Sequence, residues 1–140
     1  MLKAKGSPET RKNEAMSHED TPQTSPGEAI RRKVMGDSFV DSALAKANDF
    51  TQPMQDYIND HGWGSTWQRQ GLDLKTRSLI TIAMLTALKA PQELKGHIRG
   101  ALNNGASIEE IREVLLHSAV YCGAPAAQEA FRAAQEVLLS

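Results

Sequence analysis

The chain has 140 residues, and its 16 Lys and Arg nearly balance 17 Asp and Glu, which leaves a formal net charge of -1. This length suits one domain with a real core, and the balanced charge argues against a basic surface for nucleic acid or anionic membranes. Cys122 is the only cysteine, which excludes an internal disulfide, a C-x-x-C redox pair and a cysteine-rich zinc site. No apolar run is long enough to span a membrane, and residues 1–25 lack a secretory signal, so we expect a cytoplasmic protein.

Residues 1–24 differ from the rest of the chain in composition. They contain almost no large apolar side chains and are rich in Lys, Glu, Ser, Thr and Pro. Such a segment cannot offset the conformational entropy lost when it becomes ordered. We therefore expect a flexible N-terminal tail over residues 1–24 and a folded helical domain over residues 25–140.

Helix start and stop signals then predict three helices, over residues 25–36, 37–49 and 51–62. In the first, Ser25 is a suitable N-cap, Pro26 suits the first helical position, and Glu28 is placed to close a capping box. The first and third helices are each expected to end at a glycine. Residues 63–71 hold both tryptophans and are rich in turn-forming residues, so we expect a turn there.

Four more helices are predicted, over residues 74–90, over residues 91–105, from Ser107, and from Pro125. Asp73 caps the first of these, and its nearly continuous apolar surface predicts a central, buried helix. Ser107 and Glu110 have the spacing of a capping box. No convincing run of alternating strand residues occurs, so the fold is expected to be an all-α, single-domain bundle of six to seven helices.

Glu93 and His97 are four residues apart in the predicted helix over residues 91–105, so both side chains leave the same face. They are either a solvated surface pair or a carboxylate that orients an imidazole and raises its proton affinity, which would give a proton donor near neutral pH. Gly96 and Gly100 have the same spacing and form a strip without side chains next to His97. Each glycine costs roughly 1 kcal/mol in a helix interior, so the strip should let another helix or a flat ligand approach closely.

The segment from residue 63 to residue 77 combines flat apolar rings with cations. It holds Trp63, Trp67, Arg69, Lys75 and Arg77. This mixture suits a small cyclic anion, which would stack on the rings and pair with the cations. The alternative is structural, with the rings in the core and the arginines on the surface.

Other candidate residues have simpler explanations. Glu110 is accounted for by its place in the capping box with Ser107. His117 follows Glu113 by four residues, which predicts an exposed pair and not a metal site, because no third ligand has the right spacing. Cys122 ends an apolar helical face, so we expect a packed, inert thiol.

Two blocks of sequence, HGWGSTWQRQGLDLKTRSLITIA and ELKGHIRGALNNGASIEEIREVLLHSAVYCGAPAA, resemble the carboxymuconolactone decarboxylase family. The resemblance extends from about Ile30 to Leu139. The second block is similar to the wider superfamily that includes the alkylhydroperoxidase D proteins. The W-G-x-x-W-x-R and R-S-L of the first block resemble the decarboxylase branch in particular, and the family implies an all-helical, alkylhydroperoxidase D-like fold.

The peroxidase branch differs at three positions that carry its chemistry. It has a Glu nineteen residues before the histidine and cysteines seven and four residues before it. Counting back from His97, this chain has Ser78, Ala90 and Glu93 there. Dithiol peroxide chemistry is therefore excluded at this site, because both thiols are missing.

The resemblance implies decarboxylation of 4-carboxymuconolactone to 3-oxoadipate enol-lactone in protocatechuate breakdown, with no cofactor or metal. The departing carboxylate lies at the far end of a C=C conjugated with the lactone carbonyl, so the released electrons flow to the carbonyl oxygen. The protein then has to orient a dianion, keep the scissile carboxylate poorly solvated, stabilise the developing oxyanion and protonate a ring carbon.

The expected catalytic residues are His97, as proton donor or oxyanion contact, and Glu93, as the group that orients it. The expected substrate-binding residues are Arg77, Arg69, Trp63, Trp67 and Ser78. Arg77 and Arg69 would anchor the spectator carboxylate, while the two tryptophans would form dry walls against the ring.

The expected partners are a small lactone dicarboxylate and further copies of the chain. Family resemblance implies a homo-oligomer, a trimer or a hexamer, and no nucleic acid or membrane partner is expected. Two alternatives to the decarboxylase stay open: a related helical oligomer that acts on another lactone, and a non-catalytic binding protein.

Overall fold

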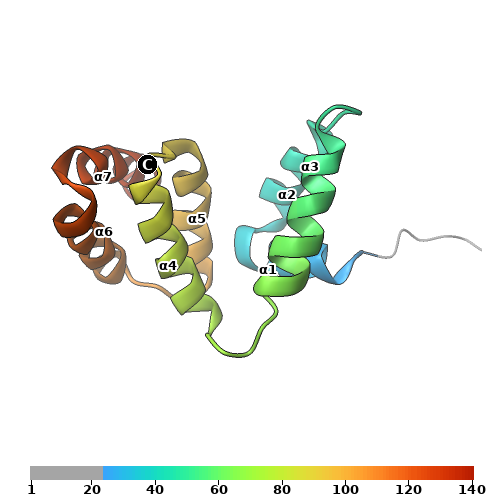
Figure 1. The fold of residues 1–140 in the computed structure, drawn as a ribbon, viewed down its shortest axis with the longest axis horizontal. Helices are drawn as coiled ribbons and strands as arrows, with labels where there is room; N and C mark the ends of the chain where they lie inside the picture. Colours follow the sequence, from blue (N-terminus) through green and yellow to red (C-terminus); the bar gives the residue numbers. More distant parts are fainter. Residues whose placement is uncertain (1–23) are drawn as a thin grey trace, which may run out of the picture.

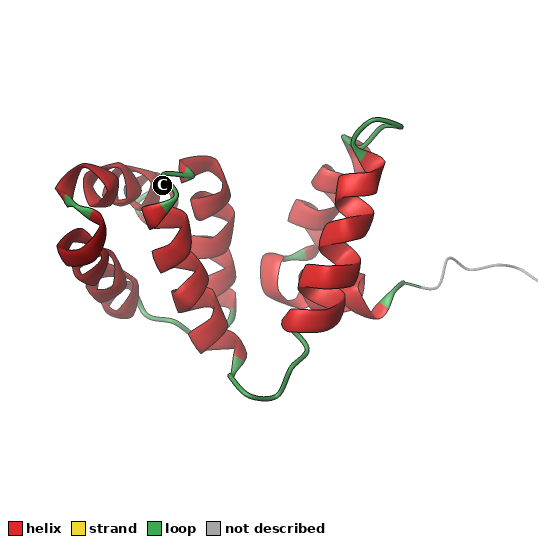
Figure 2. Ribbon diagram, in the orientation of Figure 1, coloured by secondary structure: helices red, strands yellow, loops and turns green. Residues whose placement is uncertain are grey.

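The computed structural model describes residues 24–140. Its elements are α1 (Pro26–Met35), α2 (Asp37–Ala45), α3 (Gln52–Tyr57), η1 (Ile58–Thr66), α4 (Leu74–Ala87), α5 (Pro91–Asn103), α6 (Ile108–Cys122) and α7 (Ala124–Leu138). Helices joined by loops make up this part of the chain, and no strand occurs in it (Figure 2). The predicted all-α class is confirmed. The tail expected over residues 1–24 lies, except for Thr24, outside the described residues.

The helices form two groups that lie side by side (Figure 1). Helices α4–α7 pack against one another as a bundle, here called the C-terminal bundle. Helices α1 to η1 form the second group, here called the N-terminal half, and α1 joins the two groups because it packs against both η1 and α5. None of these helices is long and apolar enough to cross a membrane.

Side-chain caps fix the starts of three helices, as the sequence predicts. The hydroxyl of Ser25 accepts a hydrogen bond from the Glu28 amide at 3.2 Å, and Asp73 caps α4 in the same way. Ser107 and Glu110 form the complete reciprocal box at the start of α6. The box expected for α1 is only half formed, because the Glu28 carboxylate bonds to Arg32 instead.

The third predicted helix does not end at Gly62. The chain continues from α3 into η1, a nine-residue π-helix, and the Trp67 amide donates to the Gly62 carbonyl at 3.0 Å in the wider π pattern. The turn expected over residues 63–71 is therefore wrong for its first four positions. Gly64 helps to explain the difference, because a Cβ there would lie 2.6 Å from the carbonyl oxygen of Asn59.

The backbones of α1 and η1 touch at Gly27. A Cβ on Gly27 would lie 1.9 Å from the Asn59 carbonyl oxygen and 2.9 Å from the Gly64 amide nitrogen. Neither atom belongs to a flexible side chain, so only glycine allows this approach. The contact fixes α1 against the π-helix.

The glycine strip of α5 is occupied by other helices and not by open space. A Cβ on Gly96 would meet the ends of Met35 and Phe39 at 3.1 Å, and a Cβ on Gly100 would meet Val34 and Met35. Helices α1 and α2 therefore pack against α5 at this glycine strip. This answers the question of whether a helix or a ligand approaches it.

Helix α4 is central in its contacts but is not buried on all sides. It packs against α5, α6 and α7 through one face, and its fully buried side chains are Ser78, Ile82 and Thr86. On the opposite side, Ile80, Met84 and Leu88 are 38%, 59% and 74% exposed. The prediction of a buried helix is thus wrong for this face of the single chain, because no element of residues 24–140 covers it.

Candidate active site

Three aromatic rings from both halves of the molecule meet in one cluster. Trp63 lies in η1, Trp67 directly follows it, and His97 lies on α5. The two tryptophan rings stack with centroids 4.7 Å apart, and the His97 ring lies 6.2 Å from Trp63 at an angle of only 7°. The structure thus brings together three of the residues that the sequence suggested, and we call them the ring cluster.

His97 is an electrically neutral imidazole at pH 7. Burial is the main reason that its pKa falls from 6.5 to about 4, and the positive charge of Arg31 lowers the pKa further. Glu93 acts in the expected direction, raising the pKa, but it is outweighed. The expectation that His97 has a raised pKa and donates a proton near neutral pH is therefore wrong for the free protein. The buried Nδ1 of His97 has no hydrogen-bond partner within residues 24–140.

Glu93 does not orient the imidazole in this structure. It leaves α5 on the same side as His97, but its side chain is exposed, while His97 is largely buried. No hydrogen bond or ion pair joins the two among the described residues. The spacing of four residues gave the shared face correctly, but it carries no information on how deeply each side chain lies.

Arg77 and Arg69 are joined through the backbone. The Nη2 of Arg77 donates to the Arg69 carbonyl at 3.0 Å, and this bond ties the segment after Trp67 to α4. The Nε of Arg77 is buried and has no partner in the described part of the chain. The exposed Arg69 side chain lines a cavity of about 670 Å³, together with Trp67 and Lys33. His97 is not among the residues that line this cavity, so Trp67 is the link between the cavity and the ring cluster.

Ser78 lies in the packed interior between α4 and α5. Its side chain is fully buried, and its hydroxyl accepts a hydrogen bond from the side chain of Asn104 at 2.9 Å. The same amide of Asn104 also donates to the Leu74 carbonyl, so the pair holds the start of α4 against the end of α5. The expectation that Ser78 binds substrate stays a prediction, and in this structure its hydroxyl is enclosed and already hydrogen-bonded.

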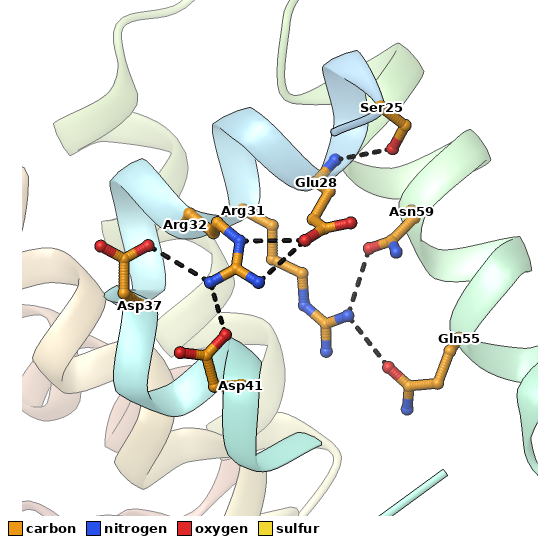
Figure 3. Close-up of polar contacts among 8 residues, drawn as sticks. All are labelled: Ser25, Glu28, Arg31, Arg32, Asp37, Asp41, Gln55 and Asn59. Carbon is orange, nitrogen blue, oxygen red and sulfur yellow. Dashed lines mark hydrogen bonds and ion pairs between the residues drawn. The ribbon is translucent and has the colours of Figure 1, made fainter. Parts of the chain in front are cut away.

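Arg31 is a charged residue near the ring cluster that the sequence analysis missed. It lies on α1 and is only 5% exposed. Its Nη1 donates to the side-chain oxygens of Gln55 at 2.9 Å and Asn59 at 3.1 Å (Figure 3). A signal was present in the sequence, because Arg31 falls at helical spacing between Gly27 and Val34 on the buried face of α1.

The remaining candidates lie away from the ring cluster. Glu110 has the predicted structural role and also pairs with Lys75 at 3.0 Å. His117 is exposed and lies beside Tyr121, and no group of three or more His, Cys, Asp or Glu within residues 24–140 could hold a metal ion. Cys122 is exposed, so the packed thiol expected there is wrong; it ends α6, where nothing in the described chain covers it.

Comparisons with known proteins agree with the motif analysis. The model of the carboxymuconolactone decarboxylase family matches residues 52–136. The chain is 46% identical over 112 residues to nitrosuccinic acid decarboxylase from Metarhizium robertsii, which covers 80% of this chain and 78% of that protein. It is 42% identical over 111 residues to 4-carboxymuconolactone decarboxylase from Acinetobacter baylyi, and the aligned region covers 79% of this chain and 83% of the relative. The chain belongs to the carboxymuconolactone decarboxylase family.

Proposed function

We propose that this protein is a cofactor-independent decarboxylase of a small dicarboxylic acid, with 4-carboxymuconolactone as the first candidate substrate. The observation that carries the proposal is similarity over about four fifths of the chain to two decarboxylases. One of them is named for nitrosuccinic acid, which makes that acid the second candidate.

The two candidate acids share an electronic property. In 4-carboxymuconolactone the electrons released with CO2 pass through a C=C to the lactone carbonyl oxygen. In nitrosuccinic acid the carboxylate on the nitro-bearing carbon can leave with its electrons delocalised into the nitro group. Each acid is its own electron sink, and each reaction ends when a proton is added to carbon. The protein has to hold a dianion, exclude water and supply hydrogen bonds and a proton.

The ring cluster suits these tasks. The tryptophan rings exclude water from one side of His97, and the neutral imidazole carries an N–H group that can stabilise a developing oxyanion. A bound dianion also favours the protonated imidazole, because opposite charges attract strongly where water is excluded. We therefore assign His97 to the oxyanion contact and to proton transfer after the substrate has bound.

The experiment that tests the proposal measures CO2 release from each acid by the purified protein in the presence of EDTA. His97→Gln should reduce turnover by at least about a hundredfold, the usual scale for losing an acid-base group. His61→Gln removes an exposed histidine of η1 that is not part of the ring cluster, and it is the matched control. Near-normal turnover of His97→Gln would exclude His97 from the mechanism. Release of CO2 from neither acid by the wild-type protein would favour another lactone or a non-catalytic protein.

We also propose that the protein is a homo-oligomer, a trimer or a hexamer, that associates through α4 and α6. Large apolar side chains are exposed on these two helices: Ile80, Met84, Leu116 and Val120. A groove of about 670 Å³ runs between the helices and is lined mainly by this apolar surface. Exposed apolar surface of this kind is typical of an interface. Leu116→Asp should dissociate the oligomer in sedimentation analysis, whereas Gln128→Asp on α7 should not.

Two further expectations are kept as part of the proposal. The folded domain extends over residues 25–140, and the protein works in the cytoplasm, where an exposed thiol such as that of Cys122 stays reduced. Limited proteolysis and cell fractionation test these two points.

A further inference from the structure

We propose that Arg31 binds a carboxylate of the substrate, and that Gln55 and Asn59 are positioning residues for its guanidinium group. The inference rests on the proposed function, since it names the group that holds the carboxylate that is not lost. It adds Arg31 to Arg77 and Arg69, the arginines expected to anchor that carboxylate, of which Arg77 already donates one hydrogen bond to the Arg69 carbonyl.

The hydrogen bonds of Arg31 leave one edge of the guanidinium free. Both acceptors, Gln55 Oε1 and Asn59 Oδ1, bond to the same nitrogen, Nη1 (Figure 3). Nε and Nη2 have no partner among the residues drawn in Figure 3, and neither is among the enclosed, unpartnered nitrogens of the described chain. The donors of Nε and Nη2 are therefore not used by any residue drawn there, and their edge has the forked geometry that binds a carboxylate through two parallel hydrogen bonds.

No carboxylate of residues 24–140 forms an ion pair with Arg31. The carboxylates on this surface form ion pairs with the neighbouring Arg32: Glu28 at 2.8 Å, Asp41 at 2.8 Å and Asp37 at 3.3 Å. Gln55 and Asn59 offer only neutral oxygens. The charge of Glu28 favours the charged form of Arg31 from a distance, but burial has the larger effect and lowers the pKa of Arg31. A buried cation whose hydrogen-bond partners are neutral is costly unless an anion completes the site. A substrate carboxylate is an anion of the right shape.

The position of Arg31 places such an anion at the ring cluster. Asn59 precedes Trp63 by four residues in η1, and Trp63 stacks on His97. The charge of Arg31 acts directly on His97, whose pKa it lowers. Gly27 lies one turn before Arg31 and fixes α1 against η1. A dicarboxylate held by Arg31 would therefore have its second carboxylate beside the rings, where little water reaches it.

A binding experiment tests this inference without turnover. The chain has two tryptophans, and both lie in the ring cluster, so intrinsic tryptophan fluorescence reports on the site. Succinate serves as an unreactive dicarboxylate, and its dimethyl ester, which has no carboxylate to offer Arg31, serves as the uncharged probe. Wild-type protein should bind succinate more tightly than the ester. Arg31→Gln should weaken succinate binding at least about tenfold and remove this preference, because a charged hydrogen-bonded pair is lost. Arg99→Gln, at an exposed arginine on α5, should change neither.

Gln55→Glu separates binding from structure. It places a carboxylate next to the Arg31 guanidinium, so the fold keeps or gains thermal stability while the internal carboxylate competes with the ligand. We expect succinate binding to weaken at least about tenfold, and the KM for the reactive acid to rise more than kcat falls. Wild-type binding by either Gln55→Glu or Arg31→Gln would overturn the inference, as would a wild-type protein that does not respond to succinate. If neither acid releases CO2 but succinate binding depends on Arg31, the carboxylate site stands and the decarboxylase proposal fails.

Discussion

The C-terminal bundle and the N-terminal half each enclose their own cluster of buried side chains. The bundle encloses aliphatic residues and alanines from four regular helices. The N-terminal half encloses a smaller cluster that includes Trp63, and it also contains a nine-residue π-helix, the backbone contact at Gly27 and the buried Arg31. The two halves are thus both helical, but one is regular and the other contains several costly features.

These costly features gather around the ring cluster. Long π-helices are rare and often mark functional sites, and a buried cation without an ion pair is retained only where something compensates for it. The regular bundle contributes one side chain, His97, on the helix that receives α1. Under the proposed function, the bundle provides a rigid support and the N-terminal half provides most of the binding chemistry.

Gly27→Ala should have the largest effect on stability. The new Cβ would lie 1.9 Å from a backbone oxygen, so α1 has to move away from η1 and can no longer hold Arg31 in place. Overpacking against rigid atoms commonly costs up to about 3 kcal/mol, and we expect at least that value here. Urea unfolding measures the loss, and succinate binding should fall with it. A variant with wild-type stability and binding would show that the contact at Gly27 does not organise the site.

The next largest effect is the pH dependence that His97 gives to the free energy of unfolding. Unfolded chain binds a proton at His97 below about pH 6.5, whereas the folded protein does so only near pH 4. Unfolding therefore takes up a proton between these values, and this residue makes stability fall as pH decreases, by about 1.4 kcal/mol per pH unit and about 3 kcal/mol in all. The free energy of unfolding, measured from pH 7 to pH 4, should depend less on pH in His97→Gln by this amount. Equal slopes would contradict a buried neutral imidazole.

The contrast between the regular C-terminal bundle and the N-terminal half also explains which features could be predicted from the sequence. Caps at Asp73 and Ser107 are local patterns, and they give the starts of α4 and α6 correctly. The three rings were also singled out from the sequence, the tryptophans because they stand among cations and His97 because it follows Glu93 by four residues. The helical continuation past Gly62 was missed, because it depends on the contact between residues 27 and 59, which are far apart in sequence.

Charged and polar side chains were the least predictable part of the site. Helical spacing places Glu93 on the same face as His97, and the mixture of rings and cations over residues 63–77 suggests Arg77 as an anchor, yet depth and competing partners decide what each side chain contacts. The Arg77 guanidinium is bonded to a backbone carbonyl, and Ser78 is enclosed by the core. The role proposed for Arg31 depends on Gln55 and Asn59, which local patterns cannot connect to it.

Loss of a helix cap should have a smaller effect, and a matched pair makes it informative. Ser25→Ala and Ser107→Ala each remove a hydroxyl that caps a helix, which costs about 1 kcal/mol. Ser107 caps α6 in the regular bundle, whereas Ser25 caps α1, which bears Arg31. Thermal unfolding should show similar losses in both variants. Only Ser25→Ala should also weaken succinate binding, and an equal effect of both on binding would remove the distinction between the halves.

Gly96→Ala should have the smallest effect, because its surroundings can adapt. The new Cβ would lie 3.1 Å from the ends of the Met35 and Phe39 side chains, which are flexible and can shift by a few tenths of an ångström. Alanine also favours the helix by up to about 1 kcal/mol, so the net change in stability should stay within about 1 kcal/mol. Comparing the stability of Gly96→Ala with that of Gly27→Ala separates two kinds of close contact. The added methyl group meets movable side chains at Gly96 and fixed backbone at Gly27. A loss of stability as large as that of Gly27→Ala would mean that the packing of α1 on the glycine strip of α5 is as rigid as its contact with η1.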